Sequence, residues 1–111
     1  MKSLLLLMLV GLLSTGTYAQ IEDGQLNIIA VFAHPDDADS KMGGTAALMA
    51  KMGHNVKFVS ITNGDAGHHE EGGGMLAKRR RAEAQEAARQ LGIAEHTGSD
   101  NHDGELQPEM H

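Results

Sequence analysis

The sequence predicts an α/β fold, in which an incomplete parallel sheet with flanking helices runs strand, helix, strand, helix and then a weak third strand. Two stretches, 26–33 and 56–62, are rich in β-branched and aromatic residues and have the length of strands. Between them, apolar residues recur every three or four positions, which is the spacing of a helix. A strand, a helix and a strand in this order imply a right-handed crossover between parallel strands.

The first strand is predicted over Leu26 to Ala33, because a continuous apolar run is typical of a strand buried on both faces of a parallel sheet. Asp39 or Ser40 can cap the helix that follows, and Gly53 can end it. The second strand is predicted over Val56 to Thr62. We interpret the apolar stripe of the intervening helix as core; it comprises Met42, Thr45, Ala46, Met49 and Met52.

A second helix is predicted over Met75 to Leu91, and its register places one arginine on the buried side. Arg80 shares a stripe with apolar residues, so its guanidinium must be paired, either with Glu83 or with an anionic or polar ligand. The stripe of this helix comprises Leu76, Arg80, Ala84, Ala87 and Leu91, while Lys78, Arg79 and Arg81 are expected on the solvated face.

The third strand, before Asp100, is expected to be weak because residues 96–99 offer little to pack into a sheet.

The first 19 residues have the pattern of a secretory signal peptide. Lys2 gives the positive start, and Leu4 to Leu13 is too short for a membrane span, which needs about 20 apolar residues. Small residues ending at Ala19 fit a cleavage site. Cleavage there predicts an exported chain, periplasmic or secreted, that covers residues 20–111 and keeps no stable membrane anchor.

Composition limits the partners and the chemistry. The 92 of 111 residues that follow the predicted cleavage site can build one small domain. Because Lys2 is the only charged residue before that site, cleavage changes the formal net charge from −6 to −7, which argues against nucleic acid as a partner. The chain has no cysteine, so any metal must be held by histidine, aspartate or glutamate.

The strongest functional motif is Ala33-His34-Pro35-Asp36-Asp37, where the first apolar run stops. The carboxyl end of a strand in a parallel α/β unit faces the crevice in which ligands bind. His34 and Asp37 carry zinc ligand types, and Pro35 stiffens the backbone between them. Asp36 is then free to take a proton from a water molecule.

This motif has two other interpretations, a turn and a phosphatase motif, and both are weaker than the metal site. The run can form a turn in which Asp37 or Asp39 caps the next helix. Asp37-x-Asp39 also resembles the aspartyl nucleophile motif of phosphatases, although His34 occupies the strand end where such a nucleophile would lie.

The glycine-rich and charged loop 63–74 is predicted to be a mobile lid or rim of the pocket. A phosphate cradle is the weaker alternative, since no Gly-Lys-Ser/Thr follows and the neighbouring glutamates repel anions. His68 and His69 are expected to be solvated loop histidines rather than metal ligands.

Several motifs together carry a resemblance to a known family. They are AHPDD after the apolar strand, GGTAALMAKMGH, the turn TNGDAG and RRAEAQEAA, with Asp100 to Leu106 similar to the loop after that family's third strand. The chain resembles the PIG-L (LmbE-like) family of zinc-dependent N-acetylglucosamine deacetylases over nearly all of residues 20–111. The resemblance implies a Rossmann-like α/β fold and the amino-terminal part of a deacetylase domain.

The resemblance also implies roles for site residues: His34 and Asp37 bind Zn²⁺, Asp36 is the general base, and Arg80 helps to hold the substrate. The chain departs from the family's common motif at Ala38, where glutamate is usual. In the family, a downstream His-x-x-His element supplies the third zinc ligand and a catalytic acid. With the third ligand missing before His111, we expect a truncated and inactive fragment, and we favour neither His102 nor His111 as a substitute.

The predicted function is therefore zinc-dependent removal of the N-acetyl group from an N-acetylglucosamine-type sugar or glycoconjugate. The alternative is a non-catalytic exported α/β binding fragment. The exact sugar, its aglycone and the oligomeric state do not follow from the sequence.

Overall fold

The computed structural model describes residues 24–108. The predicted signal peptide, 1–19, and His111 lie outside the described residues. Among residues 24–108, no helix has both the length and the apolar character needed to cross a membrane.

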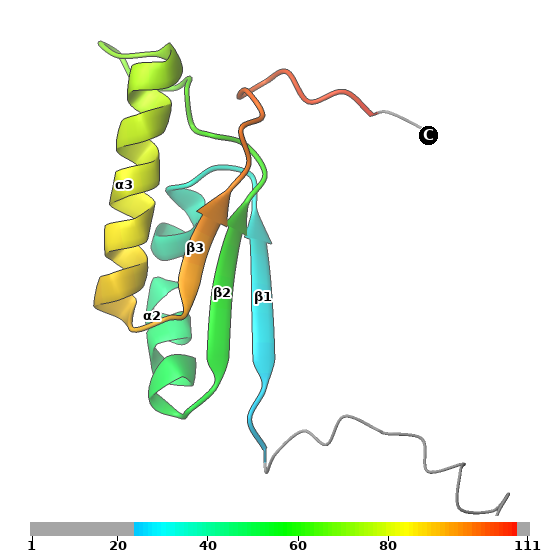
Figure 1. Cartoon of the computed structure of the whole chain (residues 1–111), viewed down its shortest axis with the longest axis vertical. Helices are drawn as coiled ribbons and strands as arrows, with labels where there is room; N and C mark the ends of the chain where they lie inside the picture. The colour runs from blue at the N-terminus through cyan, green and yellow to red at the C-terminus, as the bar shows by residue number, and fades with distance from the viewer. Residues whose placement is uncertain (1–23, 109–111) are drawn as a thin grey trace, which may run out of the picture.

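The described chain forms a three-stranded parallel sheet with two crossover helices (Figure 1). The elements are β1 (Asn27–Phe32), α2 (Asp37–Lys51), β2 (Asn55–Ser60), α3 (Gly73–Leu91) and β3 (Glu95–Gly98). The strands lie in the order β1-β2-β3, and both neighbouring pairs are parallel. The predicted α/β class, the parallel strands and the order of the elements along the chain are confirmed, and the third strand forms.

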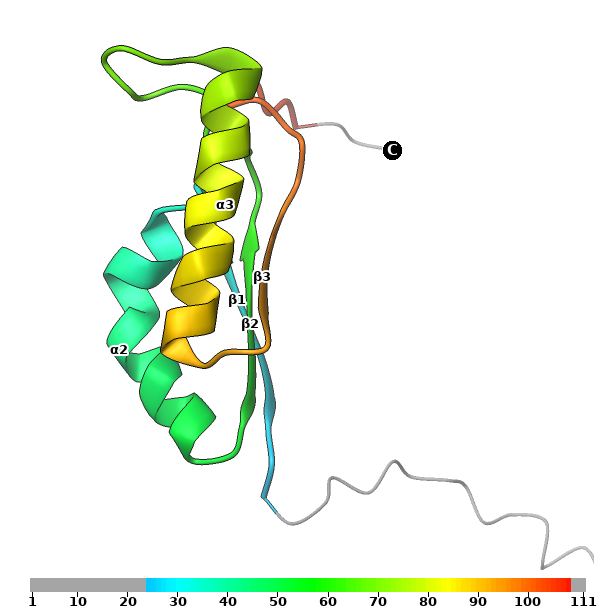
Figure 2. The same cartoon turned by 60° about the vertical axis from the view of Figure 1, so that its left-hand side comes forward.

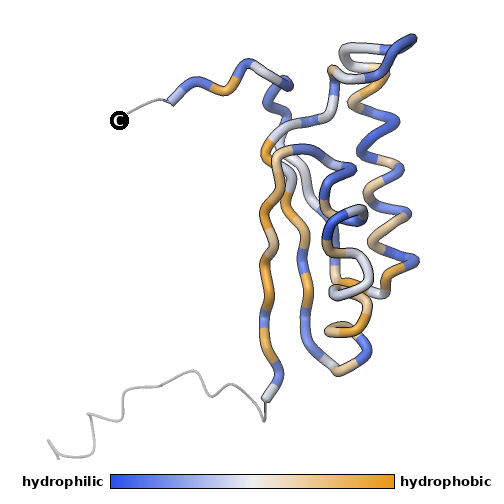
Figure 3. Tube along the Cα trace, turned by 180° about the vertical axis from the view of Figure 1, so that it is seen from behind, coloured by the Kyte–Doolittle hydropathy of each residue, from blue (hydrophilic) through white to orange (hydrophobic). Residues whose placement is uncertain are grey.

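Both helices pack on the same face of the sheet (Figure 2). On the opposite face, Ile29 is 66% exposed and Val31 is 58% exposed. The expectation that the first strand is buried on both faces was wrong for these residues, because a continuous apolar run indicates two apolar faces but does not supply a second layer to cover them. The apolar trace of β1 is visible in Figure 3.

The core lies between the sheet and the two helices. The apolar stripe predicted for the first helix is only partly buried. Met42 and Met49 pack against the core, whereas Thr45 and Met52, the C-cap of α2, are exposed. The fully enclosed core is small, as expected for a chain with few aromatic residues. The buried members of the cluster are Ala38, Ala46, Val56, Phe58, Ala88 and Ile93.

The first helix begins earlier than the capping prediction placed it. Asp36 occupies the N-cap position, and neither Asp39 nor Ser40 caps the helix. Both lie in its first turn, where Ser40 Oγ donates to the backbone carbonyl oxygens of Asp36 and Asp37 at 2.8 and 3.1 Å. Pro35 precedes the N-cap residue, and the helix begins at Asp37.

The weak third strand is held by a buried polar pair. His96 is buried, and its Nε2 lies 2.7 Å from Oγ of Ser60 on the neighbouring strand. The imidazole also meets the ring of Phe58 edge to face, with 5.7 Å between centroids. A histidine therefore replaces the apolar side chain that a strand normally packs against the core.

Candidate active-site cleft

An open cleft of about 310 Å³ lies at the carboxyl ends of β1 and β2. All four residues that the sequence predicted for the site line it: His34, Asp36, Asp37 and Arg80. The lining is completed by Pro35, Gly64, Ala66, Gly67 and Asp103. His34 and Asp36 come from the turn between β1 and α2, Asp37 is the first residue of α2, and Arg80 comes from α3.

His34 and Asp37 lie side by side where the turn after β1 meets the start of α2. Nδ1 of His34 is 3.1 Å from Oδ2 of Asp37, and the same oxygen accepts a hydrogen bond from the His34 backbone N–H at 3.1 Å. These contacts, led by the backbone hydrogen bond, lower the pKa of Asp37 below its ordinary value. The carboxylate is therefore charged over a wider pH range, as a metal ligand must be.

The separation of these two groups fits a shared zinc ion. With bonds of about 2.0–2.1 Å and tetrahedral angles, neighbouring zinc ligands lie roughly 3.3 Å apart. The observed 3.1 Å is close to that spacing. Within residues 24–108, no group of three or more histidine, cysteine, aspartate or glutamate residues is placed to hold a metal, so these two supply only part of a ligand set.

The histidines considered as further ligands are placed elsewhere. Nδ1 of His68 accepts hydrogen bonds from the backbone N–H groups of Glu70 and Glu71 at 3.2 and 3.1 Å, which makes it part of its own loop. His69 is exposed beside it. His102 pairs with Asp65 and does not line the cleft.

The Asp36 side chain makes no capping hydrogen bond, although the residue occupies the N-cap of α2. It is exposed and borders both the main cleft and an adjoining depression that Arg80 also lines. Asp36 is thus free to contact a ligand or a water molecule.

Arg80 occupies the half-buried position that its helical register predicted. Its side chain is 22% exposed, and its Nη1 donates to Oε2 of Glu83 at 2.8 Å. Gly64 lies against it with a φ of +73°, and a Cβ at Gly64 would come within 3.1 Å of Arg80 Cγ and of the Pro35 ring. A larger residue at position 64 would therefore push on both walls of the cleft.

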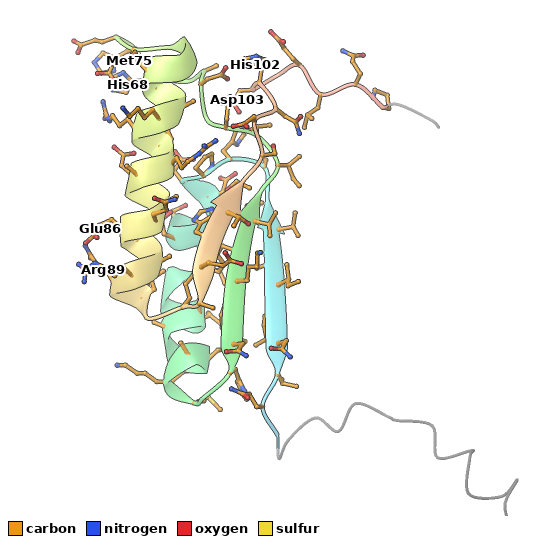
Figure 4. All side chains as sticks on the ribbon, in the orientation of Figure 1. His68, Met75, Glu86, Arg89, His102 and Asp103 are labelled. Carbon is orange, nitrogen blue, oxygen red and sulfur yellow. The ribbon has the colours of Figure 1, made fainter. Side chains whose placement is uncertain are left out.

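Asp103 is the cleft residue that sequence reasoning missed. Its Oδ2 accepts a hydrogen bond from the Ala66 backbone N–H at 3.2 Å, while its Oδ1 is buried and has no hydrogen-bond partner among residues 24–108. The available signal was its place within Asp100 to Leu106, the stretch that resembles a family loop. Figure 4 shows Asp103 beside His102, above the strand ends.

The sequence matches the family described as PIG-L, GlcNAc-PI de-N-acetylase, over residues 29–110. It is also similar to 1D-myo-inositol 2-acetamido-2-deoxy-alpha-D-glucopyranoside deacetylase of Corynebacterium jeikeium, with 34% identity over 85 residues, 64% of this chain and 26% of that protein.

Two solved structures share the fold. One is N,N'-diacetylchitobiose deacetylase from Pyrococcus horikoshii in complex with its inhibitor MPG, with a TM-score of 0.67 and 29% identity, covering 96% of this chain and 40% of that one. The other is GalB, the 4-carboxy-2-hydroxymuconate hydratase from Pseudomonas putida, with a TM-score of 0.66 and 26% identity, covering 77% and 38%. The chain thus spans 26% to 40% of the length of these three proteins.

Proposed function

Because the chain belongs to the PIG-L family, we propose that it carries the base, two zinc ligands and part of the substrate site of a deacetylase for N-acetylglucosamine-type sugars or glycoconjugates. The named activities of two relatives, on an inositol glycoside and on diacetylchitobiose, support this substrate class. The observation that carries the proposal is that His34, Asp36, Asp37 and Arg80 line one cleft.

The residues divide the work of amide hydrolysis between them. Asp36 takes a proton from the attacking water, whose oxygen adds to the acetyl carbon; the C–N bond then breaks, and the amine nitrogen receives a proton. Arg80 donates hydrogen bonds to sugar oxygens from a position fixed by Glu83. Asp103 adds a carboxylate to the cleft lining, where its charge favours the hydroxyl donors of a sugar. His34 and Asp37 would hold zinc, which when bound would supply a Lewis acid for the carbonyl and lower the pKa of water.

The 111-residue chain itself is proposed not to turn over substrate. Catalytic zinc sites normally have three protein ligands and an open position, and the described cleft offers two. His34 is the only imidazole that lines the cleft among residues 24–108. Because His34 is proposed as a zinc ligand with Asp37, the described cleft has no other histidine to protonate the amine. Such general acid catalysis contributes about 10²–10⁴ in rate.

A second candidate function is binding without catalysis, which the incomplete ligand set favours. The hydratase neighbour shows that this fold also serves a different reaction, so the product must be identified and not only the loss of substrate.

The deciding assay measures acetate released from N,N'-diacetylchitobiose with added Zn²⁺. It compares the 111-residue chain, a version extended by the remaining part of a longer relative, and Asp36→Asn in both. We expect acetate from the extended version only, with its loss in Asp36→Asn. Turnover by the short chain that depends on Asp36 would contradict the proposed inactivity, and no acetate from the extended version would contradict the deacetylase assignment.

We also propose that the chain is exported, on the pattern of residues 1–19. Expression in a bacterium followed by fractionation tests this. We expect the periplasmic or secreted product to begin at Gln20, and a product that stays in the cytoplasm with an intact amino terminus would contradict export.

A further inference from the structure

Two loops that lie 37 to 38 residues apart in sequence hold each other through reciprocal hydrogen bonds. Oδ1 of Asp65 accepts from the Asp103 backbone N–H at 3.0 Å. In return, Oδ2 of Asp103 accepts from the Ala66 backbone N–H at 3.2 Å. The remaining oxygen of Asp65 pairs with Nδ1 of His102. We call these four residues the loop bracket.

Charge and burial make His102 important to the loop bracket. The Asp65 side chain is 9% exposed, whereas that of His102 is 63% exposed. A carboxylate with so little contact with water needs hydrogen bonds or an opposite charge to remain ionised. The hydrogen bond from the Asp103 N–H lowers the pKa of Asp65 most, and the hydrogen bond from His102 lowers it further. The same contact with Asp65 raises the pKa of His102. Both effects favour the charged pair.

Only part of the loop bracket reaches the cleft. Asp103 and Ala66 line it, whereas neither Asp65 nor His102 does. The same loop is anchored independently, since Asn101 Nδ2 donates to the Ile61 carbonyl at 3.0 Å and the Asn63 N–H donates to the Asn101 carbonyl at 2.9 Å. Loss of His102 therefore leaves the loop attached but releases the local constraint on Asp103.

We propose that His102 is a positioning residue, which acts through Asp65 to set where the Asp103 carboxylate lies in the cleft and thereby the affinity of the cleft for a sugar. This inference rests on the proposed function, because it takes the ligand to be a hydroxylated N-acetyl sugar. It also gives His102 a role other than metal ligation. The side-by-side placement of His102 and Asp103 can be followed in Figure 4.

The test uses the 111-residue chain with His102→Ala, Asp65→Asn and the double variant, and His69→Ala as control. His69 is likewise an exposed histidine beside a carboxylate, since its Nε2 lies 3.6 Å from Oε1 of Glu70. It lies outside the cleft lining and the loop bracket. Amide NMR resonances of Ala66 and Asp103 report the position of Asp103. Titration with N,N'-diacetylchitobiose gives the Kd.

We expect both single variants to shift the two amide resonances and to raise the Kd roughly tenfold, as for loss of one charge-assisted hydrogen bond. The double variant should be no worse than the stronger single one, because both act on one unit. The His69 control should match wild type.

Unchanged Ala66 and Asp103 resonances in His102→Ala would overturn the inference, as would shifted resonances with an unchanged Kd. If the wild-type chain binds no sugar, the proposed function fails for this chain. The resonances then still decide whether His102 positions Asp103.

Discussion

At the residue scale, one oxygen of Asp37 meets both the backbone and the ring of His34. His34→Ala removes the imidazole but leaves the backbone N–H that Asp37 accepts, so the turn is preserved. We therefore expect zinc binding to weaken at least tenfold while the fold is retained, as measured by calorimetry and circular dichroism. His69→Ala, on an exposed loop histidine, should bind zinc like wild type. Equal zinc affinity in His34→Ala would place the metal elsewhere.

Arg80 offers a test of substrate binding that has a control on the same helix. Arg80→Lys keeps the charge but loses the planar set of donors, so we expect the Kd for N,N'-diacetylchitobiose to rise roughly tenfold in an NMR titration. Arg89 makes a comparable pair with Glu86 three residues away, far down α3 (Figure 4). Arg89→Lys should leave the Kd unchanged. The same loss in both variants would indicate a general effect on the helix.

His96 makes stability depend on pH. Burial lowers its pKa, and the negative charge of Asp39 opposes that shift only in part. The unfolded chain therefore binds a proton more readily, so this contribution to stability is present above the ordinary histidine pKa of about 6.5 and is lost as pH falls toward the lower folded value. His102 acts in the opposite sense, because its folded pKa is raised and its contribution is lost as pH rises.

Urea unfolding of wild type and His96→Gln between pH 5 and 7.5 measures this effect. We expect the stability of wild type to fall more steeply on acidification than that of His96→Gln. A parallel pH dependence of the two proteins would show that His96 is not the group responsible.

At the element scale, the turn after β2 depends on glycine at one position for two separate reasons. Gly64 has a φ of +73° and closely approaches Arg80 and Pro35, whereas Gly67 has a φ of +101° and open space where a Cβ would lie, with no atom within 4 Å. Gly64→Ala should cost about 1–2 kcal/mol from the backbone alone and should also displace Arg80 and weaken sugar binding. Gly92→Ala is the control, because Gly92 has a φ of +71°, no atom within 4 Å of a Cβ and no place in the cleft lining; it should cost a similar backbone energy and leave sugar binding unchanged. Thermal unfolding and the NMR titration together separate the two effects.

The elements and the principal site residues could be predicted because they follow local rules. A period of 3.6 residues placed Arg80 on the stripe of Leu76 and Ala84, and of the two partners that the sequence left open, Glu83 or a ligand, the structure shows the pairing with Glu83. Asp103 could not be found in this way, because its place in the cleft depends on hydrogen bonds to Asp65 and Ala66 across 37 to 38 residues. The partner of His96 could not be found locally either, because its Nε2 pairs with Ser60 on another strand, 36 residues away.

At the scale of the whole molecule, the one-sided sheet predicts unequal effects of substitution. Phe58 is fully buried between the sheet and the helices, while Ile29 points to the uncovered face and is 66% exposed. Phe58→Ala should lower the free energy of unfolding by about 3–5 kcal/mol or prevent folding. Ile29→Ala should change it by less than about 0.5 kcal/mol. Chemical denaturation checks both, and a large loss in Ile29→Ala would show that something covers that face in solution.

The parallel topology also has a kinetic consequence. No two neighbouring strands are joined by a hairpin: the Asn27–Asn55 side-chain bond spans 28 residues, and the Ser60–His96 bond spans 36. Loop-closure entropy must be overcome before such distant contacts are gained, which slows folding relative to a chain with local contacts. The loops that carry Asp37, Gly64 and Asp103 come together only when both crossovers have closed. Assembly of the cleft is therefore limited by the folding of the whole sheet, and refolding monitored by ligand binding should show the same time course as refolding monitored by secondary structure.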